Sequence, residues 1–338
     1  MFTRNQSLRD YHTFGLAAEA EYFVSVRSTA GLKAVLKSAV ARENPLLFLG
    51  GGSNILFTRD FDGLVVHLSA KGKRVLRAKG DSVFVQAQAG EDWHEFVCWT
   101  LQQGFGGLEN LSLIPGRVGA APIQNIGAYG AAFEDVFYEL SALEIATNEM
   151  KTFTRSDCQF GYRDSVFKGE LKGRYVVLSV IFQLTRANHR IRVSYGAIRD
   201  ELQRQGIVDP SIQELSRAVV AIRQRQLPNP KELGNSGSFF KNPVVSTQRF
   251  ETLKARYPDI PAYRLSLQKC KLSAAWLIER AGWKGYRKGD VGVYEKQALV
   301  LVNHGEATGA EVLQLARAIQ ADVRQKYGIE LDVEVNLH

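Results

Sequence analysis

Cysteine is scarce in this chain of 338 residues, and the three cysteines form no motif. Cys98, Cys158 and Cys270 lie far apart, with no CxxC pair and no even-numbered framework. Free thiols in a reducing cytoplasm are therefore the simplest interpretation. The six histidines show no HExxH or comparable spacing. We consequently expect neither a disulfide framework nor a dedicated metal site.

Long hydrophobic segments are also missing. The longest apolar run, YVVLSVIF at 175–182, is far shorter than the roughly 20 residues that a membrane helix needs. The segment MFTRNQSLRD at 1–10 lacks the apolar core of a secretory signal. These absences predict a cytoplasmic protein that does not associate with a membrane.

The charged residues are not gathered into a stripe. Lysine and arginine number 43 and aspartate and glutamate 35, which gives a net charge of +8. A basic nucleic-acid-binding protein is one interpretation, but such proteins concentrate their cations on one segment or face. Scattered cations favour instead a surface that attracts small polyanions such as nucleotides and sugar phosphates. We therefore expect no nucleic-acid partner.

Helix-like and strand-like segments are mixed along the chain without an internal repeat, which predicts an α+β fold. The apolar spacing predicts helices at 31–43, 91–103 and 273–281, and strands at 45–50, 137–146, 174–184 and 298–303. Between 104 and 130 no period is visible, and the stretch is too long for an ordinary connector.

Helix-start signals mark the second half of the chain. Asp209 as N-cap, with Pro210 at the first helical position, predicts a helix that ends near Arg225. Thr308 and Glu311 form a capping box that predicts the start of the last long helix. The final residues, IELDVEVNLH, are typical of a strand.

A domain change is expected near 190–210. We predict one unit at 1–200, with two lobes at about 1–70 and 71–200, and a C-terminal α+β domain at 201–338.

Two glycine-rich loops replace the standard nucleotide-binding motifs. Ile55 stands where a Rossmann fingerprint needs glycine, and no GxxxxGK[ST] motif exists. One such loop, GGGSNILF at 50–57, would on its own be interpreted as a tight turn. A second such loop, LIPGRVGAAPIQNIGAYG at 113–130, favours anion binding over simple turns. Two rows of unshielded backbone N–H groups can hold a diphosphate. The pair predicts a cradle for a dinucleotide-sized anion.

Three polar side chains stand in positions that suit chemistry. Ser238 lies between a glycine-rich half and two phenylalanines in GNSGSFFKNP, so it is either a reagent or a hydrogen-bonded turn residue. Arg163, between Tyr162 and Asp164, is either an anion ligand or half of a surface ion pair. Glu334 alternates with two valines, and its alternative is a solvated outer face.

The motifs together resemble the UDP-N-acetylenolpyruvoylglucosamine reductase (MurB) family, type I. The match covers nearly the whole chain, in order and at family-like spacing. It runs through HTFGL, GGGSNILF, GLENLSLIPGRVGAAPIQNIGAYG, GYRDSVFK, LGNSGSFFKNP, AAWLIERAG, QALVLVN and VEV. No single motif would suffice, whereas the ordered set is highly specific.

The resemblance implies a fold and a reaction. The fold would be a bipartite FAD-binding unit of the vanillyl-alcohol-oxidase (PCMH) type, followed by a substrate-binding domain. The enzyme would be an FAD-dependent NADPH oxidoreductase of peptidoglycan precursor synthesis, and so of cell-wall biogenesis, cell shape and cell division. It would reduce enolpyruvyl-UDP-N-acetylglucosamine to UDP-N-acetylmuramate, with noncovalent FAD, as a monomer.

Roles for individual residues follow from the same resemblance. Arg163 would face the enolpyruvyl carboxylate, a protonated Glu334 would donate a hydrogen bond, and Ser238 would give the proton. The FAD-binding residues would be Gly51, Gly52, Ser53, Asn54, Pro115, Gly116, Gly119, Gln124, Asn125 and Gly127. The substrate-binding residues would be Tyr129, Tyr195, Asn242, Lys284 and Gln297.

One position departs from the family pattern, and one rival stays close. A lysine that often precedes the Leu-Pro element is here Gln226, so Arg223 or Arg225 would have to supply the lost charge. The close rival is an oxidase or dehydrogenase of small alcohols on the same flavin scaffold. That rival function gives no reason for the chain to retain Arg163, Ser238 and Glu334 as a set.

Overall fold

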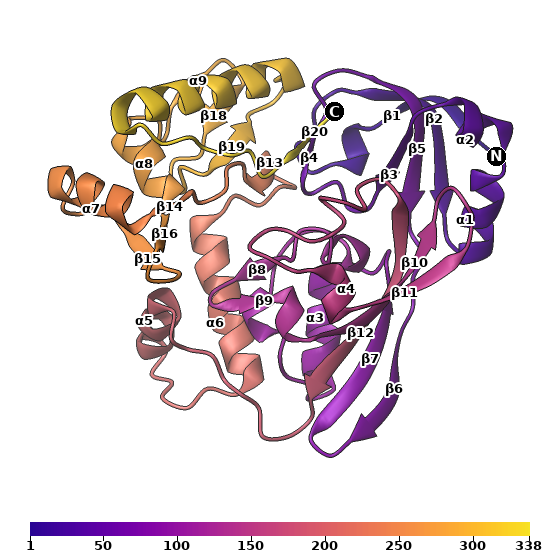
Figure 1. Cartoon of the computed structure of the whole chain (residues 1–338), viewed down its shortest axis with the longest axis horizontal. Helices are drawn as coiled ribbons and strands as arrows, with labels where there is room; N and C mark the ends of the chain where they lie inside the picture. Colours follow the sequence, from indigo (N-terminus) through magenta and orange to yellow (C-terminus); the bar gives the residue numbers. More distant parts are fainter. The chain divides into compact units, whose positions relative to one another are not determined.

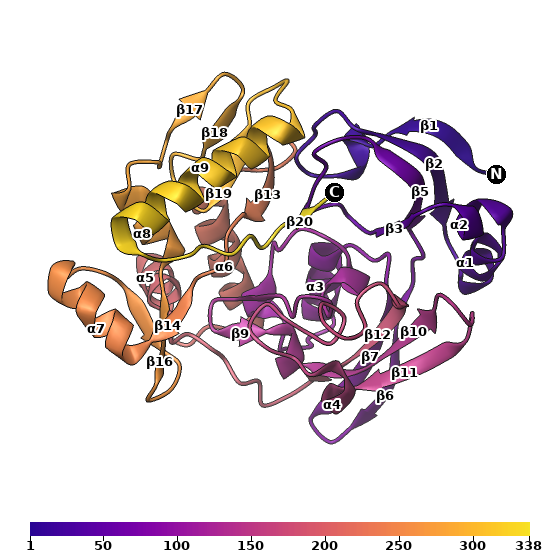
Figure 2. The same cartoon turned by 45° about the horizontal axis from the view of Figure 1, so that its top comes forward.

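The structure is a computed structural model that describes residues 1–338, and it contains two compact units (Figures 1 and 2). The first unit comprises Met1–Gln6, Ala20–Gly51 and Asp62–Arg225. The second comprises Ser7–Glu19, Gly52–Phe61 and Gln226–His338. Each unit therefore contains segments that are distant in sequence.

A four-stranded sheet with two short helices occupies the N-terminal part of the first unit. The strand order is β1 (Thr3–Ser7), β2 (Glu19–Val26), β5 (Phe61–Leu68) and β3 (Leu46–Leu49). The helix predicted at 31–43 is in fact two helices, α1 (Thr29–Leu36) and α2 (Ala39–Glu43). Ser38 separates them, because its hydroxyl donates to the carbonyl of Val35 and accepts from the N–H of Ala41.

A five-stranded antiparallel sheet forms the rest of the first unit. Its order is β11 (Met150–Thr154), β10 (Phe137–Glu144), β12 (Tyr175–Thr185), β7 (Ser82–Gln88) and β6 (Lys73–Lys79). Helix α3 (Trp93–Gln102) packs Trp93 and Phe96 against Phe182 of β12. Both figures show α3 beside this sheet. The helix predicted at 91–103 and the strands predicted at 137–146 and 174–184 are confirmed.

The aperiodic stretch 104–130 contains no long regular element, as predicted. It and the residues just after it hold only short pieces: η2 (Glu109–Leu111), η3 (Val118–Ala120), β8 (Gly127–Ala128), β9 (Ala131–Ala132) and η4 (Phe133–Asp135). A further short helix, α4 (Arg155–Cys158), follows β11. Buried apolar side chains of these pieces, such as Leu111, Val118 and Phe133, belong to the same core as the five-stranded sheet. Apolar packing holds the stretch in place together with backbone hydrogen bonds, such as the pair exchanged by Gly106 and Thr185.

Helices α5 (Gly196–Arg204) and α6 (Ile212–Gln226) also belong to the first unit. The unit boundary thus falls after Arg225, whereas the sequence placed a domain boundary at 200. The reason is that α6 is bonded to the first unit. The hydroxyls of Ser216 and Ser112 form a 2.8 Å hydrogen bond, and the side-chain amide of Gln213 donates to the carbonyl of Leu101. The predicted N-cap Asp209 is wrong. Ser211 caps α6 instead, by accepting from the N–H of Glu214 while that carboxylate accepts from the N–H of Ser211.

The second unit contains a four-stranded sheet, a three-stranded sheet, a two-stranded pair described below, and three α-helices. One sheet has the order β13 (Gly234–Ser238), β19 (Val300–Asn303), β18 (Val291–Val293) and β17 (Arg287–Lys288). The other has the order β14 (Val244–Ser246), β16 (Lys269–Leu272) and β15 (Ala262–Arg264). The helices are α7 (Thr247–Arg256), α8 (Ala274–Arg280) and α9 (Gly309–Tyr327), and α9 lies over β18 and β19 in Figure 1. Both the capping box of α9 and the helix predicted at 273–281 are confirmed.

The terminal strand predicted at 329–338 is wrong. Its regular part is only β20 (Asn336–Leu337), which pairs with β4 (Ile55–Leu56), plus an isolated bridge between Val333 and Phe240. The sequence of this segment does alternate apolar and polar residues, but the segment pairs first with Phe240 and then with β4. No continuous ladder can form over such a path.

A 3-10 turn, η1 (Arg9–Tyr11), begins the N-terminal segment of the second unit. In that unit Phe14, Leu16 and Leu56 pack in one core with residues of α8, α9 and β19. No helix in the chain is both long and apolar enough to cross a membrane. Burial raises the pKa of Cys158 to about 12, so that thiol stays protonated and unreactive near neutral pH.

Candidate functional site

Ser238 is mounted on a β-bulge at the end of β13. Asn235 pairs with Val302 and Ser238 with Val300, so the register shifts between the two. Gly237 within the bulge has a φ of +68°, a conformation that side chains disfavour, and its N–H donates to the side chain of Asn235. Phe239, directly after Ser238, is fully buried. A flexible-looking stretch is thus a rigid mount for a half-buried hydroxyl.

Glu334 lies beside this mount in the second unit. The Glu334 N–H donates to the carbonyl of Phe239 at 2.8 Å, and the Lys241 N–H donates to the carbonyl of Asp332 at 2.8 Å. The two segments therefore run antiparallel, and Glu334 sits opposite the neighbour of Ser238. Glu334 is half-buried whereas Asp332 is exposed, so the solvated-face alternative fits Asp332 alone.

Arg163 occupies a constrained position in the first unit. Its φ is +54°, in the left-handed region that residues other than glycine rarely adopt. Its guanidinium donates to the carbonyl of Gly127 at 2.5 Å and lies 5.5 Å from the centre of the Tyr162 ring. Gly127 is part of the second glycine-rich loop. The structure thereby brings a predicted catalytic residue and a predicted cofactor loop into direct contact.

A second arginine, Arg223 of α6, lies in the same neighbourhood. It donates to the carbonyl of Leu113 at 3.2 Å and lies close enough to the hydroxyl of Tyr129 to act on the pKa of that phenol. Burial lowers the pKa of Arg223, and repulsion from Arg163 acts in the same direction. Two cations that repel each other favour a bound anion.

Two tyrosines line the same cluster. The rings of Tyr129 and Tyr195 meet edge to face, with centroids 5.3 Å apart. Burial raises the pKa of Tyr129 even though Arg223 opposes this shift, so the phenol stays protonated. A protonated phenol can donate its O–H proton to an anion. The sequence predicted Tyr129 and Tyr195 as substrate ligands but did not predict the Tyr129–Arg223 pair.

The glycine-rich loops pack backbone against backbone. In the first unit, a Cβ on Gly51 would lie 3.1 Å from the Cα of Gly116. A Cβ on Gly119 would lie only 2.5 Å from the Cβ of Ala89. The loops are therefore in close contact, with the side chain of Arg117 beside Gly50 and Gly51, which fits a cradle for an extended anionic cofactor.

Gly52 packs against a different segment, the backbone of Tyr11 and His12 in the second unit. Its φ is +59°, and a Cβ there would lie 2.1 Å from the carbonyl oxygen of Tyr11. Thr13 completes the packing, because its N–H donates to Gly52 and its hydroxyl donates to the carbonyl of Asn235 at 2.6 Å. The HTFGL segment thus connects the GGGSN loop to β13, the strand of Ser238.

The remaining predicted residues occupy varied environments. Asn242 accepts from the N–H of Ala274 at 2.9 Å and so caps the start of α8. Lys284 is exposed and pairs with Glu279 at 2.8 Å, and the side chain of Gln297 accepts from the N–H of Leu299. Among the cofactor candidates, Ser53, Asn54 and Gln124 are half-buried, Pro115 is exposed and Asn125 is buried.

Two family models match the chain. Residues 20–153 match the FAD binding domain family, and residues 229–338 match the C-terminal domain of UDP-N-acetylenolpyruvoylglucosamine reductase. The expected flavin-binding fold and the α+β class are thereby confirmed.

Full-length relatives agree with these matches. UDP-N-acetylenolpyruvoylglucosamine reductases from Flavobacterium johnsoniae and Chromobacterium violaceum are each 50% identical to the chain and span 98% of both sequences. The crystal structure of the Thermus caldophilus UDP-N-acetylenolpyruvylglucosamine reductase superposes with a TM-score of 0.68 at 23% identity, covering 100% of this chain and 98% of that one. The chain belongs to the UDP-N-acetylenolpyruvoylglucosamine reductase family.

Proposed function

We propose that the chain reduces enolpyruvyl-UDP-N-acetylglucosamine to UDP-N-acetylmuramate, with NADPH as the hydride donor and FAD as the carrier. Membership of the family makes it an FAD-dependent oxidoreductase of peptidoglycan precursor synthesis. The observation that carries the finer proposal is the bulge that fixes Ser238 beside the segment of Glu334.

The chemistry explains why the substrate needs these side chains. FAD, when bound and reduced by NADPH, would supply the hydride that adds to the enolpyruvyl methylene carbon. The substrate carboxylate is already an anion, and hydride addition makes the system dianionic and enolate-like. Preorganised cations and hydrogen-bond donors must therefore be in place where the new charge develops.

The chain supplies a group for each need. Arg163 binds the carboxylate with a planar fork that cannot lose its proton. Glu334 assists in its protonated form, because an ionised carboxylate would repel the growing charge. Ser238 gives its proton to the enolate-like carbon, from the single position that the bulge allows. Arg223 and the Tyr129 hydroxyl support the anionic sugar nucleotide.

A turnover experiment tests the proposal directly. The purified flavoprotein should consume NADPH only when the enolpyruvyl sugar nucleotide is added, and should form one UDP-N-acetylmuramate for each NADPH. NADPH absorbance and product chromatography measure the two quantities. Consumption of a simple alcohol with dioxygen, and no conversion of the UDP-sugar, would favour the rival oxidase.

FAD should be held without a covalent bond. The glycine-rich loops offer backbone N–H groups, and neither 50–57 nor 113–130 contains a histidine or cysteine for a flavin linkage. Acid precipitation should therefore release the yellow colour completely into the supernatant, as absorbance will show. Flavin that stays with the washed pellet would contradict this expectation.

A further inference from the structure

Asn125 uses its whole side chain within the protein. The residue is 3% exposed and has a φ of +44°, in the left-handed region. Its amide nitrogen donates to a carboxylate oxygen of Glu134 at 2.9 Å and to the carbonyl of Gly161 at 3.0 Å. Its amide oxygen accepts from the N–H of Glu134 at 3.0 Å. Both N–H groups of the Asn125 side chain already donate hydrogen bonds. Asn125 could therefore contact a cofactor only through its backbone or through the second lone pair of its side-chain oxygen.

The carbonyl that Asn125 holds belongs to the loop of Arg163. Two further bonds join this loop to the glycine-rich loop: Ser165 donates to the carbonyl of Ile123 at 2.6 Å, and Arg163 donates to that of Gly127. Three side chains thus connect residues 123–127 with residues 161–165. The cofactor loop and the arginine loop are therefore joined by three hydrogen bonds.

We propose that Asn125 and Glu134 form a clamp that positions Arg163 for the substrate carboxylate. Neither residue is a catalytic residue, because each acts through the loop of Arg163. Arg163 has an unfavourable backbone conformation, which persists only where its surroundings enforce it. A bidentate guanidinium contact also tolerates little misplacement. The inference rests on the proposed function, since it is that substrate which brings the carboxylate.

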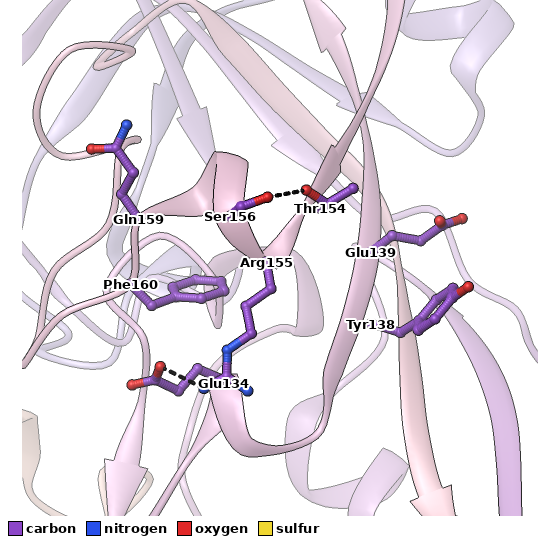
Figure 3. Close-up of a pocket in the computed structure, with 8 residues that line it drawn as sticks. All are labelled: Glu134, Tyr138, Glu139, Thr154, Arg155, Ser156, Gln159 and Phe160. Atoms are coloured by element: carbon purple, nitrogen blue, oxygen red, sulfur yellow. Dashed lines mark hydrogen bonds and ion pairs between the residues drawn. The ribbon is translucent and has the colours of Figure 1, made fainter.

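Glu134 is itself fixed from outside. Its second carboxylate oxygen accepts from Arg155 at 3.0 Å, and Figure 3 shows this pair among the residues that line a pocket of about 750 Å³. The clamp is therefore a chain of contacts from Arg155 through Glu134 and Asn125 to the carbonyl of Gly161. Glu134 is thus an acceptor held between two donors, Asn125 and Arg155.

The chemistry of the clamp permits an exchange of partners. Asn125→Asp replaces the donor with a carboxylate, which repels both Glu134 and the carbonyl of Gly161. Glu134→Gln alone keeps an oxygen that can accept from Asn125, so its effect should be small. Combined with Asn125→Asp, however, the new amide can donate to the new carboxylate. The double variant should then recover part of what Asn125→Asp loses.

The measurement is a ratio of two dissociation constants. The oxidised flavoprotein, without NADPH, is titrated with the enolpyruvyl sugar nucleotide and with UDP-N-acetylglucosamine, which lacks the carboxylate; flavin absorbance and calorimetry report binding. Asn125→Asp should reduce the preference for the carboxylate ligand by about tenfold, while UDP-N-acetylglucosamine binds within about twofold of wild type. The double variant should regain at least threefold.

Asn148→Asp is the matched control. Asn148 is another left-handed asparagine in the first unit, and its amide donates to the carbonyl of Lys33 at 3.1 Å. A residue that only stabilises the fold should lower the melting temperature and leave the ratio as it is. Should Asn125→Asp fail to fold, Glu134→Ala removes the acceptor and is expected to lower the same ratio.

The outcomes separate the two proposals. The clamp is overturned if Asn125→Asp or Glu134→Ala keeps the wild-type preference for the enolpyruvyl sugar nucleotide over UDP-N-acetylglucosamine. It is also overturned if the double variant has a lower preference than Asn125→Asp. In both cases the proposed function still stands. A wild-type protein with no preference for the carboxylate ligand overturns the proposed function, and the clamp with it. Selective loss with recovery in the double variant supports the clamp.

Discussion

Ser238→Ala is expected to slow one half-reaction and leave the other near its normal rate. NADPH never meets the atom that the hydroxyl protonates, so bleaching of the flavin by NADPH should continue. Reoxidation by the enolpyruvyl sugar nucleotide should slow by roughly a hundred- to ten-thousand-fold, the range for a lost general acid. This loss corresponds to about 3–5 kcal/mol of transition-state stabilisation. Stopped-flow absorbance of the flavin measures each half separately.

Ser236→Ala provides the comparison for this variant. Ser236 lies in the same strand, is buried, and donates to the carbonyl of Ile55 at 3.2 Å. Its loss should cost about 1 kcal/mol of stability and affect both half-reactions alike. Ser238→Cys, which keeps a proton donor, should retain more activity than the alanine variant. Equal slowing of both halves in Ser238→Ala would make Ser238 a hydrogen-bonded turn residue.

Arg163→Lys should lower kcat/KM by about ten- to a hundredfold although the charge is kept. A lysine offers a point charge in place of the planar fork, and it also loses the bond to Gly127. A hydrogen bond to a charged group contributes about 1.5–3 kcal/mol, which gives this range. Steady-state kinetics with the enolpyruvyl sugar nucleotide measure the effect.

A second arginine of the first unit serves as the reference for Arg163. Arg174 forms an exposed ion pair with Glu144 at 3.2 Å, and such pairs contribute little. Arg174→Lys should therefore have nearly wild-type kinetics. If Arg163→Lys matched it, Arg163 would be a structural residue and would lose its assigned role at the carboxylate.

Local signals in the sequence predicted much of the secondary structure. The capping box at Thr308 and the apolar spacing of 91–103 are local properties, and both elements form where they were predicted. The errors arise where a tertiary contact or a second polar residue intervenes. Ser38 divides one apolar helix pattern into two helices, and Ser211 caps α6 in place of Asp209.

The candidate site was predictable only in part, for a related reason. The family motifs named Ser238, Glu334 and Arg163 as residues, but not how each is held. The bulge at Gly237 depends on the partner strand β19. The Asn125–Glu134 bonds and the approach of Tyr129 to Arg223 of α6 involve a stretch without a period, where no sequence pattern specifies which polar groups will meet.

The divided composition of the second unit has a consequence for the order in which a newly made chain can fold. Residues 7–19 and 52–61 belong to that unit, yet they are synthesised long before residues 226–338. Phe14, Leu16 and Leu56, which are buried in its core, must wait for β19 and α9 to emerge from the ribosome. During this interval they are exposed apolar surface, the kind that attracts chaperones or promotes aggregation. The distance along the chain between partners should also make this unit fold slowly.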